Sequence, residues 1–128
     1  MKYVYPAIFT PLEDGQFDVY IPDLPHCRTC GVGLAEAIEM AEDAASMWLY
    51  DAESNNEPIP SPSESLPYEF PQFVSFIKAD TLAYSRAINN RAVKKTLTIP
   101  AWLNEQAEKS HVNFSGVLQE ALKAHLQI

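Results

Sequence analysis

Residues 93–103 read VKKTLTIPAWL, and the spacing of the apolar side chains changes inside this stretch. From Lys94 to Ile99 polar and apolar residues nearly alternate, which is typical of a strand with one buried and one wet face. Pro100 follows at a position where a helix can begin, because proline is tolerated in the first helical turn. The stretch therefore predicts a strand over 93–99 that leads directly into a helix.

The residues after this strand complete a small C-terminal unit. We expect a helix over about 101–110, a turn at Ser110–Asn113 and a second helix over about 114–126. A lone strand has no ladder partner, so two copies would pair their strands antiparallel above the helices of both. The apolar side chains that would meet in the shared interior are Leu97, Ile99, Leu103, Ala107, Val117, Leu118, Ala121 and Leu122. The pattern thus predicts a homodimer through residues 92–128.

The wet face of the predicted strand carries Lys94, Thr96 and Thr98, a row of hydrogen-bond donors without an acid. Doubled by a two-fold axis, this row would form a ribbon that fits the major groove of B-DNA. Lysine donates to guanine acceptors there, and threonine offers a hydroxyl and a methyl group. The ordinary alternative is a solvated edge strand, since such strands favour lysine. We favour DNA binding because strand, proline, helix, turn and capped helix follow in that order.

The start of the second helix is a further candidate contact with nucleic acid. Asn113, Phe114 and Ser115 stand where backbone N–H groups are unpaired, which is a natural site for a phosphate. The alternative is that Asn113 only caps the helix.

The N-terminal part has the pattern of a small α+β layer. We expect strands at Tyr3–Phe9, Phe17–Ile21, 28–32 and Phe73–Ile77, a hairpin turn at Glu13–Gly15, a helix at Leu34–Tyr50 and an exposed loop at 51–69. This gives the order β-β-β-α-β. The predicted domains are residues 1–80 and 92–128, and residues 81–91 form a linker or a short helix.

The charge of the chain is divided unevenly between its two parts. Residues 1–75 hold two basic residues and thirteen acids, for a net charge of −11, and residues 76–128 hold seven basic residues and four acids, for +3; together they give −8. The acidic part should avoid nucleic acid, whereas the basic part can approach it. No apolar run reaches the roughly 18 residues that span a bilayer, and the first residues do not resemble a secretory signal, so we expect a soluble cytoplasmic protein.

The two cysteines, Cys27 and Cys30, form a CxxC pair. Such a pair indicates redox chemistry at the start of a helix, or half of a zinc site when a second pair exists. No second pair is present, and His26, His111 and His125 are scattered along the chain. We therefore expect reduced thiols with a structural role, no metal and no cofactor.

Two stretches resemble known families. Residues 93–126, VKKTLTIPAWLNEQAEKSHVNFSGVLQEALKAHL, resemble ribbon-helix-helix repressor domains of the Arc and MetJ type. Residues 17–45, FDVYIPDLPHCRTCGVGLAEAIEMAEDAA, resemble the N-terminal domain of HicB antitoxins, which has a partial RNase H-like fold. In this order the two stretches are similar to a full-length HicB protein with a ribbon-helix-helix tail. The resemblance places Lys94, Thr96 and Thr98 at base-reading positions and Asn113 to Ser115 at a phosphate-contacting helix start.

The sequence departs from the family pattern at two positions. Lys95 falls at an inward-facing strand position where an apolar residue is usual, and His26 stands where the family commonly has glycine before Cys27. The first departure predicts a looser ribbon pair, and the second predicts a different local turn.

The resemblance implies an antitoxin that neutralises a HicA-like toxin, a small RNA-cleaving protein, and represses its own operon by binding operator DNA. An acidic N-terminal domain would attract a basic toxin, and we expect Asp18, Tyr20 and Asp23 to contact it. A nuclease would need convergent carboxylates for metal ions, usually with one on the first strand. Tyr3–Phe9 holds no acid, so we expect no catalytic residue. Two alternatives remain open: a ligand-responsive ribbon-helix-helix repressor without a toxin partner, and an adaptor whose C-terminal part only dimerises.

Overall fold

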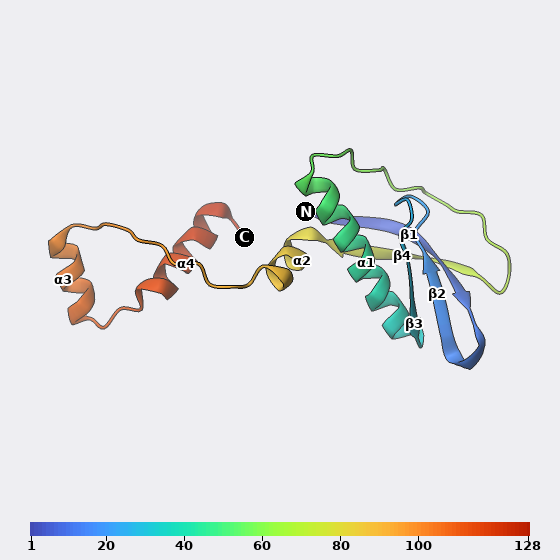
Figure 1. The fold of residues 1–128 in the computed structure, drawn as a ribbon, viewed down its shortest axis with the longest axis horizontal. Coiled ribbons are helices and arrows are strands. Elements are labelled where there is room, and N and C mark those ends of the chain that lie inside the picture. Colours follow the sequence, from blue (N-terminus) through green and yellow to red (C-terminus); the bar gives the residue numbers. More distant parts are fainter. The chain divides into compact units, whose positions relative to one another are not determined.

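A four-stranded antiparallel sheet carries the N-terminal part of the chain. The computed structural model describes residues 1–128, which divide into two units, Met1–Arg91 and Ala92–Ile128. The strands are β1 (Lys2–Pro11), β2 (Gln16–Tyr20), β3 (Arg28–Val32) and β4 (Phe73–Asp80), in the spatial order β3-β2-β1-β4 (Figure 1). Helix α1 (Leu34–Ser54) lies between β3 and β4 in the sequence. The expected α+β order of three strands, a helix and a strand is confirmed.

The turn of the β1–β2 hairpin lies where the sequence predicts it. Glu13–Gly15 forms a short 3-10 turn, and Leu12 N–H donates to the Gln16 carbonyl at 2.7 Å. Asp14 and Gly15 both have positive φ angles, of 64° and 75°. Glycine adopts this conformation freely and aspartate tolerates it better than most residues, which explains why these two residue types occupy the turn.

Helix α1 covers one face of the sheet. Odd-numbered residues of β1 point toward it, and Tyr5, Ala7 and Phe9 are fully buried there. The helix presents mainly small side chains to the sheet, at positions 37, 41 and 45, so its backbone can approach closely. A Cβ atom built on Gly31 of β3 would lie 2.6 Å from the Ala37 backbone nitrogen. Glycine is therefore required at this position of β3.

Helix α1 continues to Ser54, beyond the predicted end at Tyr50, so the expected loop begins later than the sequence indicates. Tertiary contacts hold this last turn. The Tyr3 hydroxyl donates to Glu53 Oε1 at 2.6 Å, and Thr81 Oγ1 donates to the same oxygen at 3.1 Å. The hydrogen bond to the Glu53 carboxylate, helped by burial, raises the pKa of Tyr3 to about 12.

Strand β4 and the segment after it also run further than expected. Helix α2 (Thr81–Ile88) starts directly after β4, and the Asp80 side chain caps it by accepting from Leu82 N–H and Ala83 N–H, each at 3.1 Å. The Tyr84 ring packs on Tyr50 of α1, with 5.4 Å between ring centroids. This segment is a helix packed on the first unit rather than a free linker.

The second unit consists of helices α3 (Ala101–Lys109) and α4 (Phe114–Leu126). The strand predicted over 93–99 is absent in the single chain: residues 90–100 belong to no helix or strand (Figure 1). The physical reason is that the segment has no ladder partner within its own chain. No side chain of the unit is buried. Its exposed large apolar residues are Val93, Leu97, Ile99, Trp102, Leu103, Phe114, Val117, Leu122, Leu126 and Ile128.

Candidate functional site

The sheet face opposite α1 is open, and it holds two of the three residues predicted to contact a toxin. Asp18 and Tyr20 of β2 lie opposite Thr10 and Ile8 of β1, and all four side chains share this face. They line a groove of about 320 Å³ together with Val19, Arg28, Thr29 and Gln72. Asp18 is exposed, so its carboxylate is available to a partner on this face.

Arg28 of β3 contributes a feature of this face that the sequence analysis missed. Its guanidinium carbon lies 4.0 Å from the centroid of the Tyr20 ring, a cation–π arrangement. The contact follows from the β2–β3 register, which sets Tyr20 directly opposite Arg28. The sequence does contain a signal for this contact. Pairing the alternating stretches 16–20 and 28–32 as an antiparallel hairpin sets Tyr20 opposite Arg28.

Asp23, the third predicted contact, is already engaged within the chain. Its two carboxylate oxygens accept hydrogen bonds from the Ser63 backbone N–H at 2.8 Å and the Ser63 hydroxyl at 2.6 Å. The same long loop is held near its end, where Gln72 Nε2 donates to Thr10 Oγ1 at 3.1 Å. Asp23 therefore fixes the loop between α1 and β4, whereas Asp18 and Tyr20 face outward.

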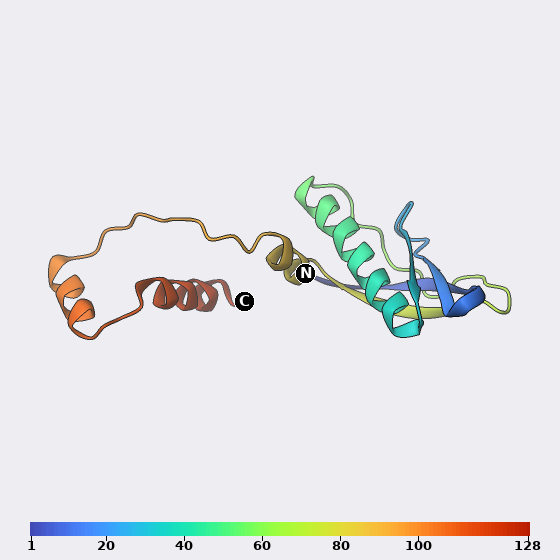
Figure 2. The same ribbon diagram turned by 60° about the horizontal axis from the view of Figure 1, so that its bottom comes forward.

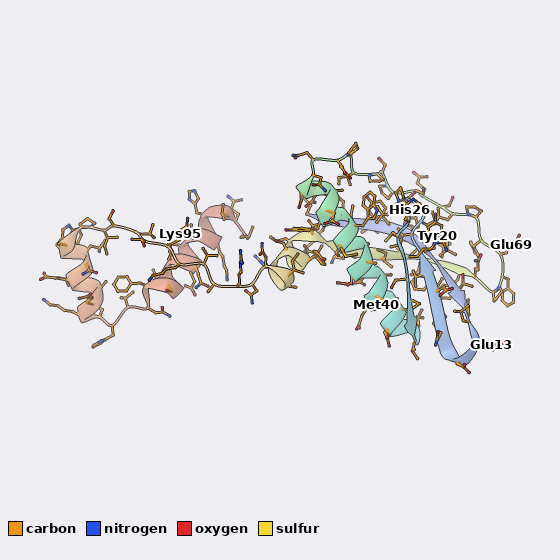
Figure 3. The ribbon with its side chains drawn as sticks, in the orientation of Figure 1. Glu13, Tyr20, His26, Met40, Glu69 and Lys95 are labelled. Carbon is orange, nitrogen blue, oxygen red and sulfur yellow. The ribbon has the colours of Figure 1, made fainter.

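Figure 3 shows Glu13 at the tip of the β1–β2 hairpin and Tyr20 at the other end of β2. Glu13 is an exposed acid that lies outside the groove. It therefore offers a matched comparison for Asp18, because the two positions carry the same charge in different surroundings.

The predicted DNA-contacting residues all belong to the second unit. Lys94, Thr96 and Thr98 are exposed in the segment before α3. Asn113 caps α4, since its Oδ1 accepts from the Gly116 N–H at 3.1 Å. Phe114 is also exposed, so the first turn of α4 has an accessible surface.

The CxxC pair consists of two free thiols in different environments. Cys27 is buried and Cys30 is exposed. Burial raises the pKa of the Cys27 thiol, which lowers its thiolate fraction and its reactivity. No group of three or more His, Cys, Asp or Glu side chains is arranged to hold a metal ion. None of the helices combines the length and apolar character needed to cross a membrane.

The family of HicB-like antitoxins of bacterial toxin–antitoxin systems matches residues 5–122, which include most of both units. The chain belongs to this family. Antitoxin HicB 1 of Photorhabdus laumondii is 37% identical over 60 residues, covering 45% of this chain and 39% of the relative. Antitoxin HicB of Escherichia coli K12 is 36% identical over 63 residues, covering 48% and 46%. The matched part is thus less than half the length of these curated relatives.

Solved structures resemble the HicB-like chain along nearly its whole length. A toxin–antitoxin complex from Streptococcus pneumoniae contains a chain with a TM-score of 0.61 and 24% identity, matched over 98% of this chain and 99% of that one. The HicB antitoxin of Burkholderia pseudomallei has a TM-score of 0.53 and 15% identity, over 97% and 96%. These likenesses describe the fold.

His26 of this HicB-like antitoxin stands where the resemblance implies glycine. Its φ angle is +64°, in the left-handed region that a side chain normally disfavours. Glycine adopts this conformation without a steric penalty, so the backbone geometry explains the family preference. Histidine is among the residues found there more often than most. Cys27 N–H donates to the Leu24 carbonyl at 3.0 Å and closes this turn.

Proposed function

We propose that this HicB-like protein neutralises a basic, RNA-cleaving HicA-like toxin through its N-terminal unit and represses its own operon through its C-terminal unit. The observation that carries the proposal is a single family match that extends over both units. Both activities would take place in the cytoplasm, where the toxin's RNA substrates and the operator DNA lie. The chain would act by binding rather than by catalysis.

The charge of the first unit supports a basic protein partner. Residues 1–91 hold fourteen acids and five basic residues, a net charge of 5 − 14 = −9. Helix α1 alone carries six acids and no lysine or arginine, so no ion pair within the helix can offset them. A surface of this sign speeds the capture of a basic partner and disfavours nucleic acid.

The open sheet face is the proposed toxin-binding surface, on what would be a partial RNase H-like domain. Asp18 supplies an exposed carboxylate, and Tyr20 supplies a ring that is held in place by Arg28. Tyrosine and arginine are enriched at the energetic centres of protein interfaces. Asp23 would contribute by holding the adjacent loop through Ser63.

Reversing the charge at position 18 tests this surface. We expect full-length Asp18→Lys to lose the ability to protect RNA from the toxin encoded beside its gene, because a lysine there repels a basic partner. The matched control is Glu13→Lys, which changes the net charge equally at the hairpin tip. Cleavage of a reporter RNA, measured against antitoxin concentration, gives the inhibition constant of each variant. Equal inhibition by the two variants would contradict the assignment of this face.

The exposed apolar side chains of the second unit support the dimeric ribbon-helix-helix arrangement. A unit with no buried residue and ten large exposed apolar side chains requires another surface to cover them. Antiparallel pairing of residues 93–99 from two copies would supply the missing strand partner and direct Leu97 and Ile99 inward. Lys94, Thr96 and Thr98 would then line the ribbon that enters the major groove. Asn113, Phe114 and Ser115 would place free N–H groups of α4 near a phosphate.

The triple variant Lys94→Ala, Thr96→Ala, Thr98→Ala tests DNA recognition. Each lost base contact should cost about 1–3 kcal/mol on the operator and much less on random DNA. A lost phosphate contact should weaken both and flatten the salt dependence by about one unit per contact. Titration of DNA from upstream of the gene at two salt concentrations separates these outcomes. The control, Lys123→Ala, removes a charge near the end of α4; triple-variant binding no weaker than that of the control would disprove the assignment.

A further inference from the structure

Phe70, in the loop between α1 and β4, is the most exposed large apolar side chain of the protein. Its exposed fraction is 96%, whereas Phe73, three residues later, stacks on the buried Phe9 with 5.1 Å between ring centroids. Figure 2 shows the end of this loop bending outward beyond the start of β4, and in Figure 3 Glu69 lies at this bend. A single exposed apolar residue is ordinary on a protein surface, so its meaning depends on the backbone that carries it.

Hydrogen bonds hold the turn that carries Phe70. The Gln72 backbone N–H donates to the Glu69 carbonyl at 2.8 Å, and the Glu69 N–H donates to Gln72 Oε1 at 3.2 Å. These two bonds close residues 69–72 on themselves. An ordered turn loses little conformational entropy when a partner binds it, so the ring at its tip is prepared for a contact.

The same turn is joined to the open sheet face. Gln72 Nε2 donates to Thr10 Oγ1 at 3.1 Å, and both residues line the groove that contains Asp18 and Tyr20. The Gln72 amide therefore bonds to the turn through its oxygen and to the sheet through its nitrogen. This double contact fixes the turn beside the groove, so a partner that covers the groove would also meet Phe70.

The charge around Phe70 restricts the kind of partner. The loop over 55–72 carries three acids, and no lysine or arginine occurs between Arg28 and Lys78. A second copy of this acidic unit, a nucleic acid or an anionic membrane would bring further negative charge to the surface, which is unfavourable. A basic protein would be attracted to it. The occupant that fits is therefore a basic protein with an apolar pocket.

We propose that Phe70 is an anchor for the toxin, and that its ring enters an apolar pocket flanked by basic residues on the toxin surface. Glu69 pairs with one of these basic residues, while the groove at Asp18 covers the adjoining surface. Aromatic residues are enriched in interface cores, and a few buried anchors carry most of the binding energy of an interface. The inference rests on the proposed toxin-binding function and adds a contact outside the groove.

Phe70→Ala in the full-length chain tests the anchor. Because the side chain is 96% exposed, the melting temperature should stay within about 2 °C of the wild type. The inhibition constant against RNA cleavage by the toxin encoded beside the gene should rise about tenfold to a hundredfold, which corresponds to the burial of one phenylalanine. The matched control is Met40→Ala, which removes an exposed apolar side chain from α1, on the other face of the sheet. This control should inhibit like the wild type.

Thr10→Val tests whether the bond from Gln72 holds the anchor in place. Valine has nearly the same shape but cannot accept this hydrogen bond, so the turn gains freedom and the inhibition constant should rise about twofold to tenfold. Thr10→Ser keeps the accepting oxygen and should restore most of the affinity. In a Phe70→Ala background Thr10→Val should have almost no further effect, because the ring that it positions is gone.

The outcomes separate the anchor from the function on which it rests. If the wild-type chain does not protect RNA from the toxin, the toxin-binding function is wrong and the anchor is wrong with it. If the wild type protects RNA and Phe70→Ala protects it equally well, or no worse than Met40→Ala, only the anchor is overturned. If Phe70→Ala lowers the mass of the free protein in sedimentation, the ring contacts a second copy, which also overturns the proposal. An undiminished effect of Thr10→Val in the Phe70→Ala background would overturn the positioning role of Gln72.

Discussion

Replacing Leu97 with aspartate is expected to abolish association through the C-terminal unit. In the single chain Leu97 is 63% exposed, so the substitution leaves the folding of one copy nearly unaffected. In the proposed pair the same side chain lies in the shared interior, where an unpaired charge costs about 3 kcal/mol or more in each copy. The dissociation constant of this step should therefore rise by more than about a hundredfold. Operator binding should be lost with it, since one strand cannot form a ribbon.

Thr96→Asp is the matched control, because it introduces the same charge one residue away, on the opposite face of the strand. We expect Thr96→Asp to retain C-terminal association and lose DNA binding, whereas Leu97→Asp loses both. Sedimentation and operator titration measure the two properties separately. If Leu97→Asp sedimented like the wild type, or if both variants lost association equally, the antiparallel ribbon would be wrong.

The sequence predicts best those elements whose pattern is local. Helix α1 has its apolar side chains at helical spacing, and β1 and β2 alternate around a turn of Asp14 and Gly15, so these elements lie close to their predicted positions. The end of α1 could not be predicted, because Glu53 is held by Tyr3 and Thr81, which are distant in sequence. The strand over 93–99 is absent for a related reason: its alternation is clear, but a ladder needs a partner that one chain does not contain.

For the candidate toxin contacts of the first unit too, the local pattern predicts some features and distant segments decide others. Alternation along β2 places Asp18 and Tyr20 on one face, as the structure has them. The partners of neighbouring side chains are decided by distant segments: Arg28 reaches Tyr20 through the strand register, and Ser63 binds Asp23 from forty residues away. An acid in a sequence does not reveal whether it is free for a partner. Here Asp18 is exposed, whereas the Asp23 carboxylate accepts two hydrogen bonds from Ser63.

The largest expected effect on the stability of the first unit comes from Gly31→Ala. A Cβ at this position would lie 2.6 Å from the Ala37 backbone nitrogen and 2.7 Å from its Cα. Side-chain rotation cannot relieve a contact with backbone atoms, so α1 and β3 would have to separate where Gly31 and Ala37 are both buried. Overpacking usually costs about 1–3 kcal/mol, and we expect the upper end of this range here because the neighbouring backbone is fixed at both ends. The loss should lower the melting temperature of the unit by more than about 10 °C.

The matched controls for Gly31→Ala separate the backbone collision from other effects of adding a methyl group. Cys30→Ala changes the neighbouring residue on the exposed face of β3 and should alter the free energy of unfolding by less than about 0.5 kcal/mol. Adding Ala37→Gly to Gly31→Ala should not restore stability, because the collision involves the nitrogen and Cα of residue 37 rather than its Cβ. Thermal unfolding followed by far-ultraviolet circular dichroism measures all three variants. Rescue by Ala37→Gly, or a melting temperature for Gly31→Ala equal to that of the wild type, would show that α1 does not lie as close to β3 as the structure places it.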